Sequence, residues 1–430
     1  MHTLAICNPG HFHAALTFRK AHPGLSDEVY VYSEGGPELE SFKGIVDSYN
    51  DRPEDPTNWR LHIYTGPDYL ERMIVEKKGD LAILAGKNDT KIAQIEALTR
   101  AGFSVLSDKP LVVTKAGLGH LSAALEPGRP PVMDIMTERY EITTILQKEF
   151  MAVPEVFGRP RVPEDGGPAI IKTSLHHLYK LVNGRPLVRP PWYFDVRTQG
   201  EGIVDVSTHV VDMTHWMLFP GQVIDYDRDI ELIQARRWPT DVPLDKFRLI
   251  TGQGSFPEAA REDVDGDVLR YFCNGEFVYK VRGVPVRIRV VWNLEPPPGG
   301  GDTHESIIRG TMADLRIRQV PERNFVSELL IVPRRDRGRV AGAARDCLAA
   351  WQDRYPGLSL IEEGEALLIS IPSALRTTHE QHHSKVRDEF IGYLDHGTMP
   401  PETGPNILSR YTLLNEAREL ALASPFKSLD

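Results

Sequence analysis

Three polar side chains near the middle of the chain have types and spacing suited to proton transfer. Asp205, His209 and Asp212 are spaced i, i+4, i+7 in a largely apolar stretch that is predicted to be helical over roughly 202–218, so the three would share one helix face. A carboxylate one turn from an imidazole can orient the ring and raise its basicity, as a general base requires. The apolar surroundings disfavour the alternative of a polar face that merely meets solvent.

The turn after the first predicted strand (4–7) could bind a phosphate. In a dinucleotide-binding domain this turn is rich in glycine, because backbone N–H groups must approach the pyrophosphate closely. Here residues 8–14 read Asn-Pro-Gly-His-Phe-His-Ala, and Gly10 is the only glycine among them. Asn8 can adopt the left-handed conformation in place of the first glycine. Cofactor contacts from Gly10, His11 and Phe12 are therefore one interpretation, and a plain turn is the other.

Polar side chains also follow three further predicted strands. Glu34 comes after the second strand (29–32), where a carboxylate can accept hydrogen bonds from an adenosine ribose. It would repel a 2′-phosphate and so favour NAD over NADP; a surface acid is the alternative. Asn88 and Asp108 follow the fourth and fifth strands (81–85 and 104–106), at the carboxyl edge where open α/β sheets bind ligands.

The elements that would position these groups fall into two predicted domains. Residues 1–136 alternate short apolar strands with helices, which predicts a doubly wound parallel sheet, the Rossmann arrangement. Residues 137–430 change to strands with period-2 alternation, clearest at 169–175, 267–272, 276–281, 284–292 and 306–317. This pattern predicts an α+β domain with a large, mostly antiparallel sheet. Helices are expected at 140–151, 202–218, 341–355, 384–394 and 407–423.

Composition narrows the function classes. The chain has 430 residues, and its 50 Lys+Arg and 60 Asp+Glu give a net charge of −10, so nothing in the charge favours nucleic acid or an anionic membrane as a partner. The 3 cysteines are far apart and predict neither a disulfide framework nor a zinc-ribbon site. No secretion signal and no apolar run long enough for a membrane helix is visible. We therefore expect a soluble cytoplasmic protein.

Two segments resemble the Gfo/Idh/MocA oxidoreductases, the family of glucose-fructose oxidoreductase and inositol dehydrogenase. The first is Asn88 followed by Ala-Gly-Phe-Ser-Val-Leu-Ser-Asp-Lys-Pro over 101–110, in which Asp108 replaces the usual glutamate of Glu-Lys-Pro. The second is residues 200–212, in which Glu201 and Ser207 stand where glycines are usual. A subgroup of this family, with a distinctive putative-oxidoreductase C-terminal domain, is further resembled by the sequences of residues 9–15, 56–59 and 108–110.

The resemblance implies a catalytic group and a reaction. In the family a lysine of the Glu-Lys-Pro turn and an Asp-x-x-x-His pair meet beside the nicotinamide, and these positions correspond to Lys109, Asp205 and His209. It implies an NAD-dependent oxidoreductase, with NADP less favoured, that acts on a sugar, cyclitol or other polyol by hydride transfer. Two alternatives stay open: glycoside cleavage through transient oxidation, elimination and re-reduction, and an inert ligand-binding regulator. Family precedent also implies a homo-oligomer formed through the C-terminal sheet.

Further side chains are candidates for substrate or metal contacts. The substrate candidates are Tyr140, His176, Trp192 and Arg197, which combine aromatic faces with polar groups. Residues 379–383 read His-Glu-Gln-His-His, which satisfies the bare His-Glu-x-x-His pattern of zinc proteases. The flanks of this run are polar and no third ligand is evident. Surface or interdomain histidines are therefore favoured for His379, His382 and His383, and no metal is predicted, although zinc stays an alternative.

Overall fold

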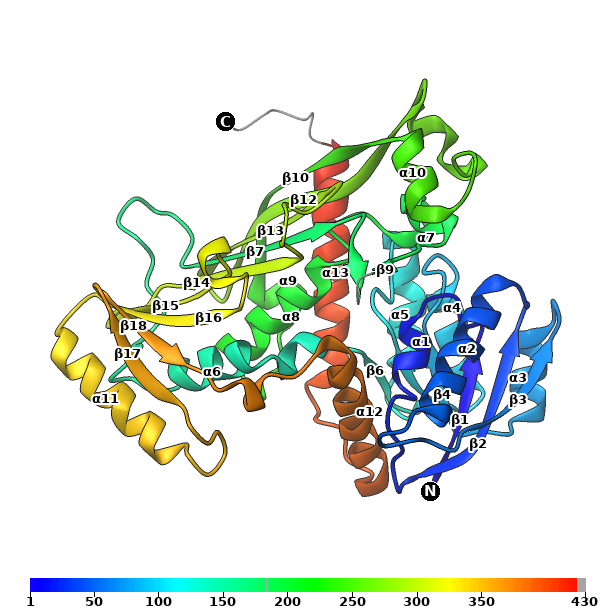
Figure 1. Cartoon of the computed structure of the whole chain (residues 1–430), viewed down its shortest axis with the longest axis horizontal. Coiled ribbons are helices and arrows are strands. Elements are labelled where there is room, and N and C mark those ends of the chain that lie inside the picture. The colour runs from blue at the N-terminus through cyan, green and yellow to red at the C-terminus, as the bar shows by residue number, and fades with distance from the viewer. Residues whose placement is uncertain (183–184, 424–430) are drawn as a thin grey trace.

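The N-terminal part is built on a fully parallel six-stranded sheet, as predicted (Figure 1). The computed structural model describes residues 1–182 and 185–423. The strand order β3-β2-β1-β4-β5-β6 is that of a Rossmann fold, with the reversal of strand order between β1 and β4. The strands are β1 (His2–Cys7), β2 (Leu25–Ser33), β3 (Arg60–Thr65), β4 (Leu81–Leu84), β5 (Ser104–Ser107) and β6 (Val132–Asp134).

Burial of apolar strands on both faces explains this sheet. All four residues of β4 are buried, and so are Leu4 and Ile6 of β1, as expected of central strands that have helices on both sides. One helix, α2, was not predicted. The helices of this part are α1 (His13–Leu16), α2 (Pro37–Asp51), α3 (Tyr69–Glu76), α4 (Lys91–Arg100) and α5 (Leu118–Ala124).

The second part contains a ten-stranded sheet, which confirms the predicted α+β class. Its main path runs β10-β12-β13-β7-β14-β15-β16-β18-β17, with β11 paired to β12. Only β7 and β13 pair in parallel, and the other neighbours are antiparallel. The strands are β7 (Ile170–His177), β10 (Ile230–Pro243), β11 (Val264–Asp265), β12 (Val268–Val281), β13 (Val284–Asn293), β14 (Thr303–Ile308), β15 (Ala313–Arg318), β16 (Glu328–Pro333), β17 (Ser359–Glu363) and β18 (Ala366–Ser370).

Two details of this sheet differ from the sequence prediction. The single strand predicted over 306–317 is two strands, β14 and β15, because the chain turns at 309–312 and Gly310 lies against the backbone of Phe157. The fourteen-residue strand β10 was not predicted at all. Its pairing with β12 carries two irregularities in register, which interrupt the alternation on which the prediction depended.

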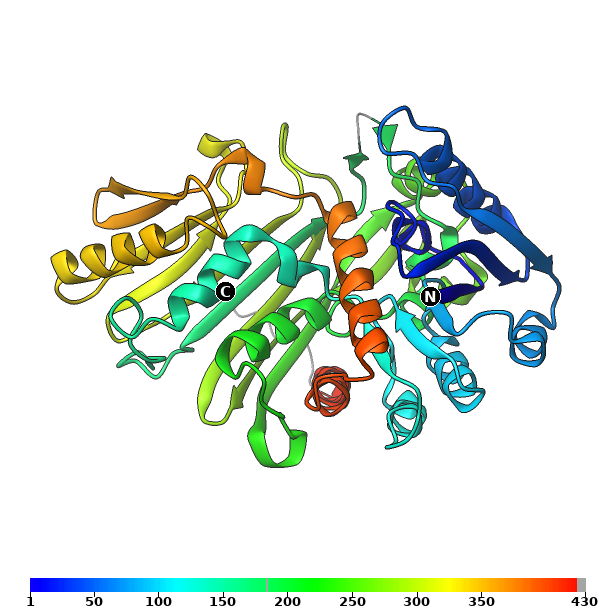
Figure 2. The same ribbon diagram turned by 90° about the horizontal axis from the view of Figure 1, so that it is seen from below.

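Helices cover one face of the large sheet (Figure 2). α6 packs on β15, and α8 and α13 lie beside it against β13 and β10. Beneath α8, Lys172 of β7 is fully buried, and its Nζ lies 3.6 Å from Met217 Sδ. The helices of this part are α6 (Ile142–Met151), α7 (Val196–Gln199), α8 (Ser207–Leu218), α9 (Tyr226–Asp229), α10 (Leu244–Thr251), α11 (Arg337–Ala350), α12 (His379–His396) and α13 (Thr403–Ala423).

Helix α12 returns to the N-terminal part and becomes part of its core. Val386, Phe390 and Ile391 pack in one buried cluster with residues of β1, α1 and α2. The fully buried Arg387 donates hydrogen bonds to the carbonyls of Thr17 and Lys20 at 2.5 and 2.6 Å. The N-terminal unit is therefore completed by a helix from far beyond residue 136.

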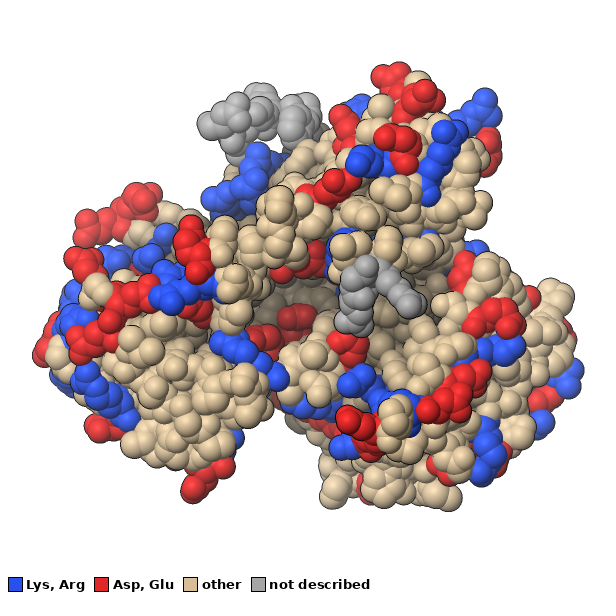
Figure 3. All heavy atoms as spheres, viewed as in Figure 1, with Lys and Arg blue, Asp and Glu red and all other residues tan. Residues whose placement is uncertain are grey.

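The surface between the two parts is hollowed. In the view of Figure 3 a depression separates the two lobes, and acidic side chains are visible inside it. Lys and Arg are interspersed with Asp and Glu over the rest of this face. Among the described residues, no helix is both long and apolar enough to cross a membrane.

Candidate active site

Lys109 and Asp205 meet where the two parts adjoin. Lys109 lies in the turn after β5, and its Nζ donates to Asp205 Oδ1 at 2.5 Å. Gln199, at the end of α7, donates from Nε2 to the other oxygen, Asp205 Oδ2, at 3.2 Å. The side chains of Lys109 and Asp205 are 12% and 6% exposed. The fold thus brings together two predicted residues that are 96 positions apart.

His209 lies beside this pair on the first turn of α8. Its Nδ1 is buried and has no hydrogen-bond partner among the described residues. Burial, followed by the positive charge of Lys109 and the proximity of His379, holds the pKa of His209 well below its ordinary value. The imidazole is therefore neutral near pH 7 and is a weaker base than an ordinary histidine.

The predicted pairing of Asp205 with His209 is not what the structure shows. α8 begins at Ser207, and no hydrogen bond joins Asp205 to the ring of His209 among the described residues. Its two carboxylate oxygens are instead held by Lys109 and Gln199. The structure therefore makes Asp205 a hydrogen-bond partner of the lysine rather than of the imidazole.

Asp212 belongs to a buried ionic network rather than to this group. Arg139 binds both of its carboxylate oxygens, at 2.6 and 2.7 Å, and Arg410 of α13 also pairs with it. Burial raises the pKa of Asp212, but the charges of Arg139 and Arg410 outweigh it and lower the pKa. Arg410 and Tyr411 further bind Asp134. The network ties β6, α8 and α13 together beneath the site.

The first βα turn has the predicted conformation at Asn8 but uses its backbone donors internally. Asn8 has φ +42°, the left-handed conformation expected in place of a glycine. The N–H groups of Gly10 and His11 both donate to the carbonyl of Ala85, at 2.9 and 3.1 Å. In this structure these two groups are therefore engaged within the protein, which favours the interpretation of a plain turn for their backbone donors.

A hollow lies beside this turn, at the carboxyl ends of β1 and β4. It is shallow and occupies the point where the strand order reverses, the usual ligand crevice of a doubly wound sheet. Glu34 is exposed after β2, and its backbone N–H donates to Asn8 Oδ1 at 3.2 Å. The hollow is lined by Cys7, Asn8, Leu84, Gly86, Lys87, Thr90, Lys91 and Gln94.

The other two predicted cofactor residues are engaged within the protein. The Asn88 amide donates to the carbonyl of Gln199 at 2.7 Å and accepts from Lys91 Nζ at 2.5 Å. Its side chain thus joins the two parts of the chain, with one N–H donor and one acceptor lone pair used in these two bonds. Asp108 accepts a hydrogen bond from His13 Nδ1 at 2.9 Å and so supports a histidine.

Of the predicted substrate residues, His176 and Trp192 adjoin one apolar cluster that contains Trp292, whereas Tyr140 contacts α12. Tyr140 donates to Glu389 of α12, and Arg197 pairs with Asp195 at 2.8 Å, so both have partners within the chain. His176 stacks on Trp292 and lies 3.3 Å from Asp302. Trp192 is partly buried in a third apolar cluster, although its Nε1 has no partner among the described residues.

One acid at the site was missed by sequence reasoning. Glu138 follows β6, where burial and then the charge of Glu141 raise its pKa to about 7. Lys109 is close enough to lower that pKa in part. Nothing in the local sequence distinguishes Glu138 from a surface acid, since the signal comes from the neighbours that surround this partly buried side chain in the folded protein.

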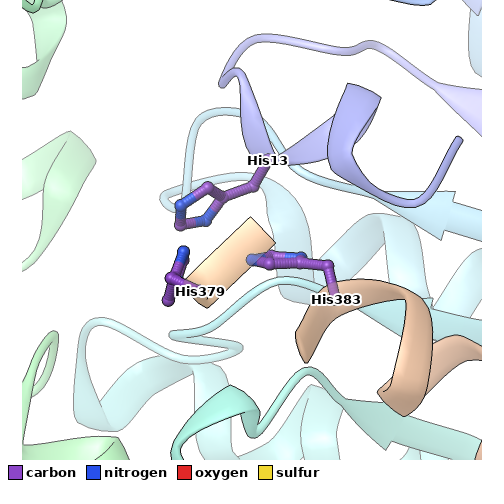
Figure 4. Close-up of side chains that lie close together, drawn as sticks. All are labelled: His13, His379 and His383. Carbon is purple, nitrogen blue, oxygen red and sulfur yellow. The ribbon is translucent and has the colours of Figure 1, made fainter. Parts of the chain in front are cut away.

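The histidine run on α12 faces the first βα turn. His379 and His383 lie on one face of α12, and His13 of α1 meets them (Figure 4). The ring centroids are 4.7 to 5.3 Å apart. His382 is not part of this group, because its Nε2 pairs with Thr377 Oγ1 at 2.7 Å. His379 and His383 therefore lie between the two parts of the chain, as expected. The third histidine of the group, His13, was not predicted.

The fold and the site together are those of a two-domain protein with a Rossmann unit and an active-site cleft beside it. A family model described as "Putative oxidoreductase C terminal domain" matches residues 146–422, and the chain belongs to this family. A putative oxidoreductase from Parabacteroides merdae ATCC 43184 is 41% identical, with 98% of each chain covered and a TM-score of 0.95.

More distant structures share the fold. A levoglucosan dehydrogenase in complex with NADH and levoglucosan is 13% identical, with 98% of this chain and 97% of that chain covered and a TM-score of 0.64. A 3-ketoreductase from Actinomadura kijaniata in complex with TDP-benzene and NADP is 14% identical, with 97% of each chain covered and a TM-score of 0.59. No curated protein matches the chain.

Proposed function

We propose that the protein is a nicotinamide-dependent oxidoreductase that transfers a hydride from a carbinol of a sugar, cyclitol or related polyol, with NAD favoured over NADP. The observation that carries the proposal is the contact of Lys109 with Asp205 beside the unpartnered imidazole of His209, at the carboxyl edge of the parallel sheet. The family and the sugar-binding and NADH-binding fold neighbours support it.

The residues around the switch-point hollow suit a dinucleotide. Glu34 offers an exposed carboxylate to the ribose hydroxyls, and Lys87 at the rim offers an ammonium group to the pyrophosphate. The side chain of Lys87 could replace the donors that Gly10 and His11 use internally. When bound, the nicotinamide supplies the hydride acceptor.

Two side chains of this chain would handle the substrate oxygen. His209 is neutral and has a free ring nitrogen, so it can accept the hydroxyl proton. Lys109 can donate a hydrogen bond to the same oxygen and stabilise its developing negative charge. Asp205 and Gln199 are positioning residues, because Asp205 holds the ammonium group of Lys109 and Gln199 holds the carboxylate of Asp205.

The test is the substitution Lys109→Ala, assayed by NADH formation with a panel of sugars and cyclitols. Loss of one donor to a developing oxyanion lowers kcat by roughly 10²–10³-fold, whereas NADH affinity, measured by fluorescence titration, should change little. Lys115→Ala is the matched control, since Lys115 is an exposed lysine that pairs with Glu416. Turnover of Lys109→Ala equal to that of the control would remove Lys109 from the mechanism.

Glu138 favours one second candidate, redox-assisted cleavage of a glycosidic bond. Net dehydrogenation needs one proton acceptor, whereas oxidation followed by elimination needs a second group that exchanges protons near neutral pH. Glu138 is such a group, because its pKa is raised to about 7 by burial and it lies near Lys109. The stoichiometry separates the two reactions: a dehydrogenase accumulates NADH with its product, whereas the cleavage route regenerates NAD and accumulates none.

A further inference from the structure

Three imidazoles from two distant segments converge on one point between α1 and α12. One nitrogen of each of His13, His379 and His383 lies within 4.8 Å of the corresponding nitrogens of the other two. Figure 4 shows the three rings turned toward one another. His379 and His383 are one helical turn apart on α12, which places both rings on the same helix face. Two ligands are thus fixed by a helix, and the third comes from the opposite side.

In the part of the chain that the structure describes, His383 lacks the hydrogen-bond partners that a buried imidazole needs. Both ring nitrogens of His383 are buried, and neither has a hydrogen-bond partner among the described residues. Burying a polar nitrogen without a partner is unfavourable. A cation placed between the three rings would give one unpartnered nitrogen of His383 a partner for its lone pair.

The third histidine is already oriented in the way that metal ligands are. The Nδ1 of His13 donates to Asp108 Oδ2 at 2.9 Å, which leaves its Nε2 as the free nitrogen. A carboxylate bound to the far nitrogen of a ligating histidine fixes the ring and raises its basicity in many zinc sites. Asp108 therefore has a function here that does not require contact with a dinucleotide.

We propose that His13, His379 and His383 bind one divalent transition-metal ion, with zinc the best match, and that Asp108 orients His13 from behind. Three imidazoles and an open fourth position are the ligand set of a catalytic zinc site. Ligands of a tetrahedral zinc stand about 3.3 Å apart, so nitrogens that lie within 4.8 Å must approach by roughly 1.5 Å at most. Small side-chain rotations cover that change.

The open position would face the active site. Lys109 and His209 both lie close enough to His13 to affect its proton affinity, so a ligand oxygen bound to the metal would lie in their neighbourhood. If the proposed oxidoreductase function holds, this oxygen is a substrate hydroxyl adjacent to the one that reacts. That role rests on the proposed function, whereas the metal site itself does not.

The experiment measures metal content and needs no turnover. The purified full-length protein is stripped with a chelator, loaded with Zn²⁺ or Co²⁺, desalted and analysed by mass spectrometry. We expect about one equivalent of metal in the wild type and less than about a tenth of an equivalent in His383→Gln. The Co²⁺ form should show the visible absorption of a tetrahedral site with nitrogen ligands.

His382→Gln is the matched control, because it removes a neighbouring histidine of the same helix that is bound to Thr377 instead. It should retain the full equivalent of metal. If His383→Gln is unfolded by circular dichroism, His13→Gln and the wild-type Co²⁺ spectrum decide the question. Wild-type protein that holds no metal after loading, or a folded His383→Gln or His13→Gln that holds as much metal as the wild type, would overturn the proposal.

Discussion

The buried lysine of β7 predicts a stability that changes with pH. Lys172 is fully buried beneath α8, and no carboxylate of the described residues pairs with it. Burial lowers its pKa from 10.5 to about 7. Between these two pKa values the unfolded chain binds a proton that the folded chain lacks, so the free energy of unfolding rises with pH across this window. Below pH 7 the burial of the charged lysine destabilises the folded protein by its full amount; this destabilisation is the penalty of burying Lys172.

Replacing this lysine with methionine should remove the penalty and keep the shape of the side chain. Each tenfold change in the proton affinity of the ammonium group corresponds to about 1.4 kcal/mol. The gain in the free energy of unfolding from Lys172→Met is therefore about 4 kcal/mol at pH 7, and it falls to about 2 kcal/mol at pH 9. The imperfect fit of methionine should cost less than about 1.5 kcal/mol.

Chemical denaturation followed by circular dichroism, repeated at several pH values, measures this gain. Lys280→Met is the control, because Lys280 is a partly exposed lysine of the same sheet that pairs with Glu231; its effect should be small at every pH. A Lys172→Met variant that is less stable than the wild type at pH 7, or whose gain does not shrink toward pH 9, would refute the reasoning.

Three further predictions concern the site and its supports. Asp205→Asn leaves the ammonium group of Lys109 without its anionic partner, so it should lower the free energy of unfolding by roughly 3–5 kcal/mol, and an unchanged melting temperature would contradict this. Glu138→Gln should remove a limb of the pH–rate profile near pH 7, since the carboxylate titrates there; an unchanged profile would show that its ionisation has no part in turnover. Arg387→Met should loosen α12 from α1 and speed hydrogen exchange in both helices, and exchange equal to that of the wild type would show that the two carbonyl contacts do not anchor α12.

The parallel sheet was predictable because its signal is local. The four residues of β4 are all apolar, and such a continuous apolar run is enough to predict a strand that is buried on both faces. The missed helix α2 also carried a signal, since its buried residues Leu39, Phe42 and Val46 have helical spacing among charged neighbours. In β10 the signal itself is broken, because two irregularities of register interrupt the alternation.

The site was predictable only where a resemblance supplied long-range contacts. Lys109 and Asp205 are 96 positions apart, and no periodicity relates them; their meeting was expected from the family motifs. The partner of His379 and His383 is His13, which comes from the first βα turn at the other end of the chain. No local pattern indicates that α12 returns to the N-terminal unit, so the third histidine could not be found from the sequence around residues 379–383.

The assignment of residues as cofactor ligands depends on which donors and acceptors the fold already uses. Asn88 has suitable chemistry, but its amide is bound to Gln199 and Lys91. Hydrogen-bond capacity is a property of the folded chain, because it depends on neighbours that are remote in sequence.

The most direct test of the central claim is a fluorescence titration of the purified protein with NADH and NADPH. We predict saturable binding of NADH and weaker binding of NADPH, because the Glu34 carboxylate would repel a 2′-phosphate. In Glu34→Ala the affinities for the two nucleotides should become similar. Protein that is folded and binds neither nucleotide would contradict the account, whatever the state of the histidine cluster.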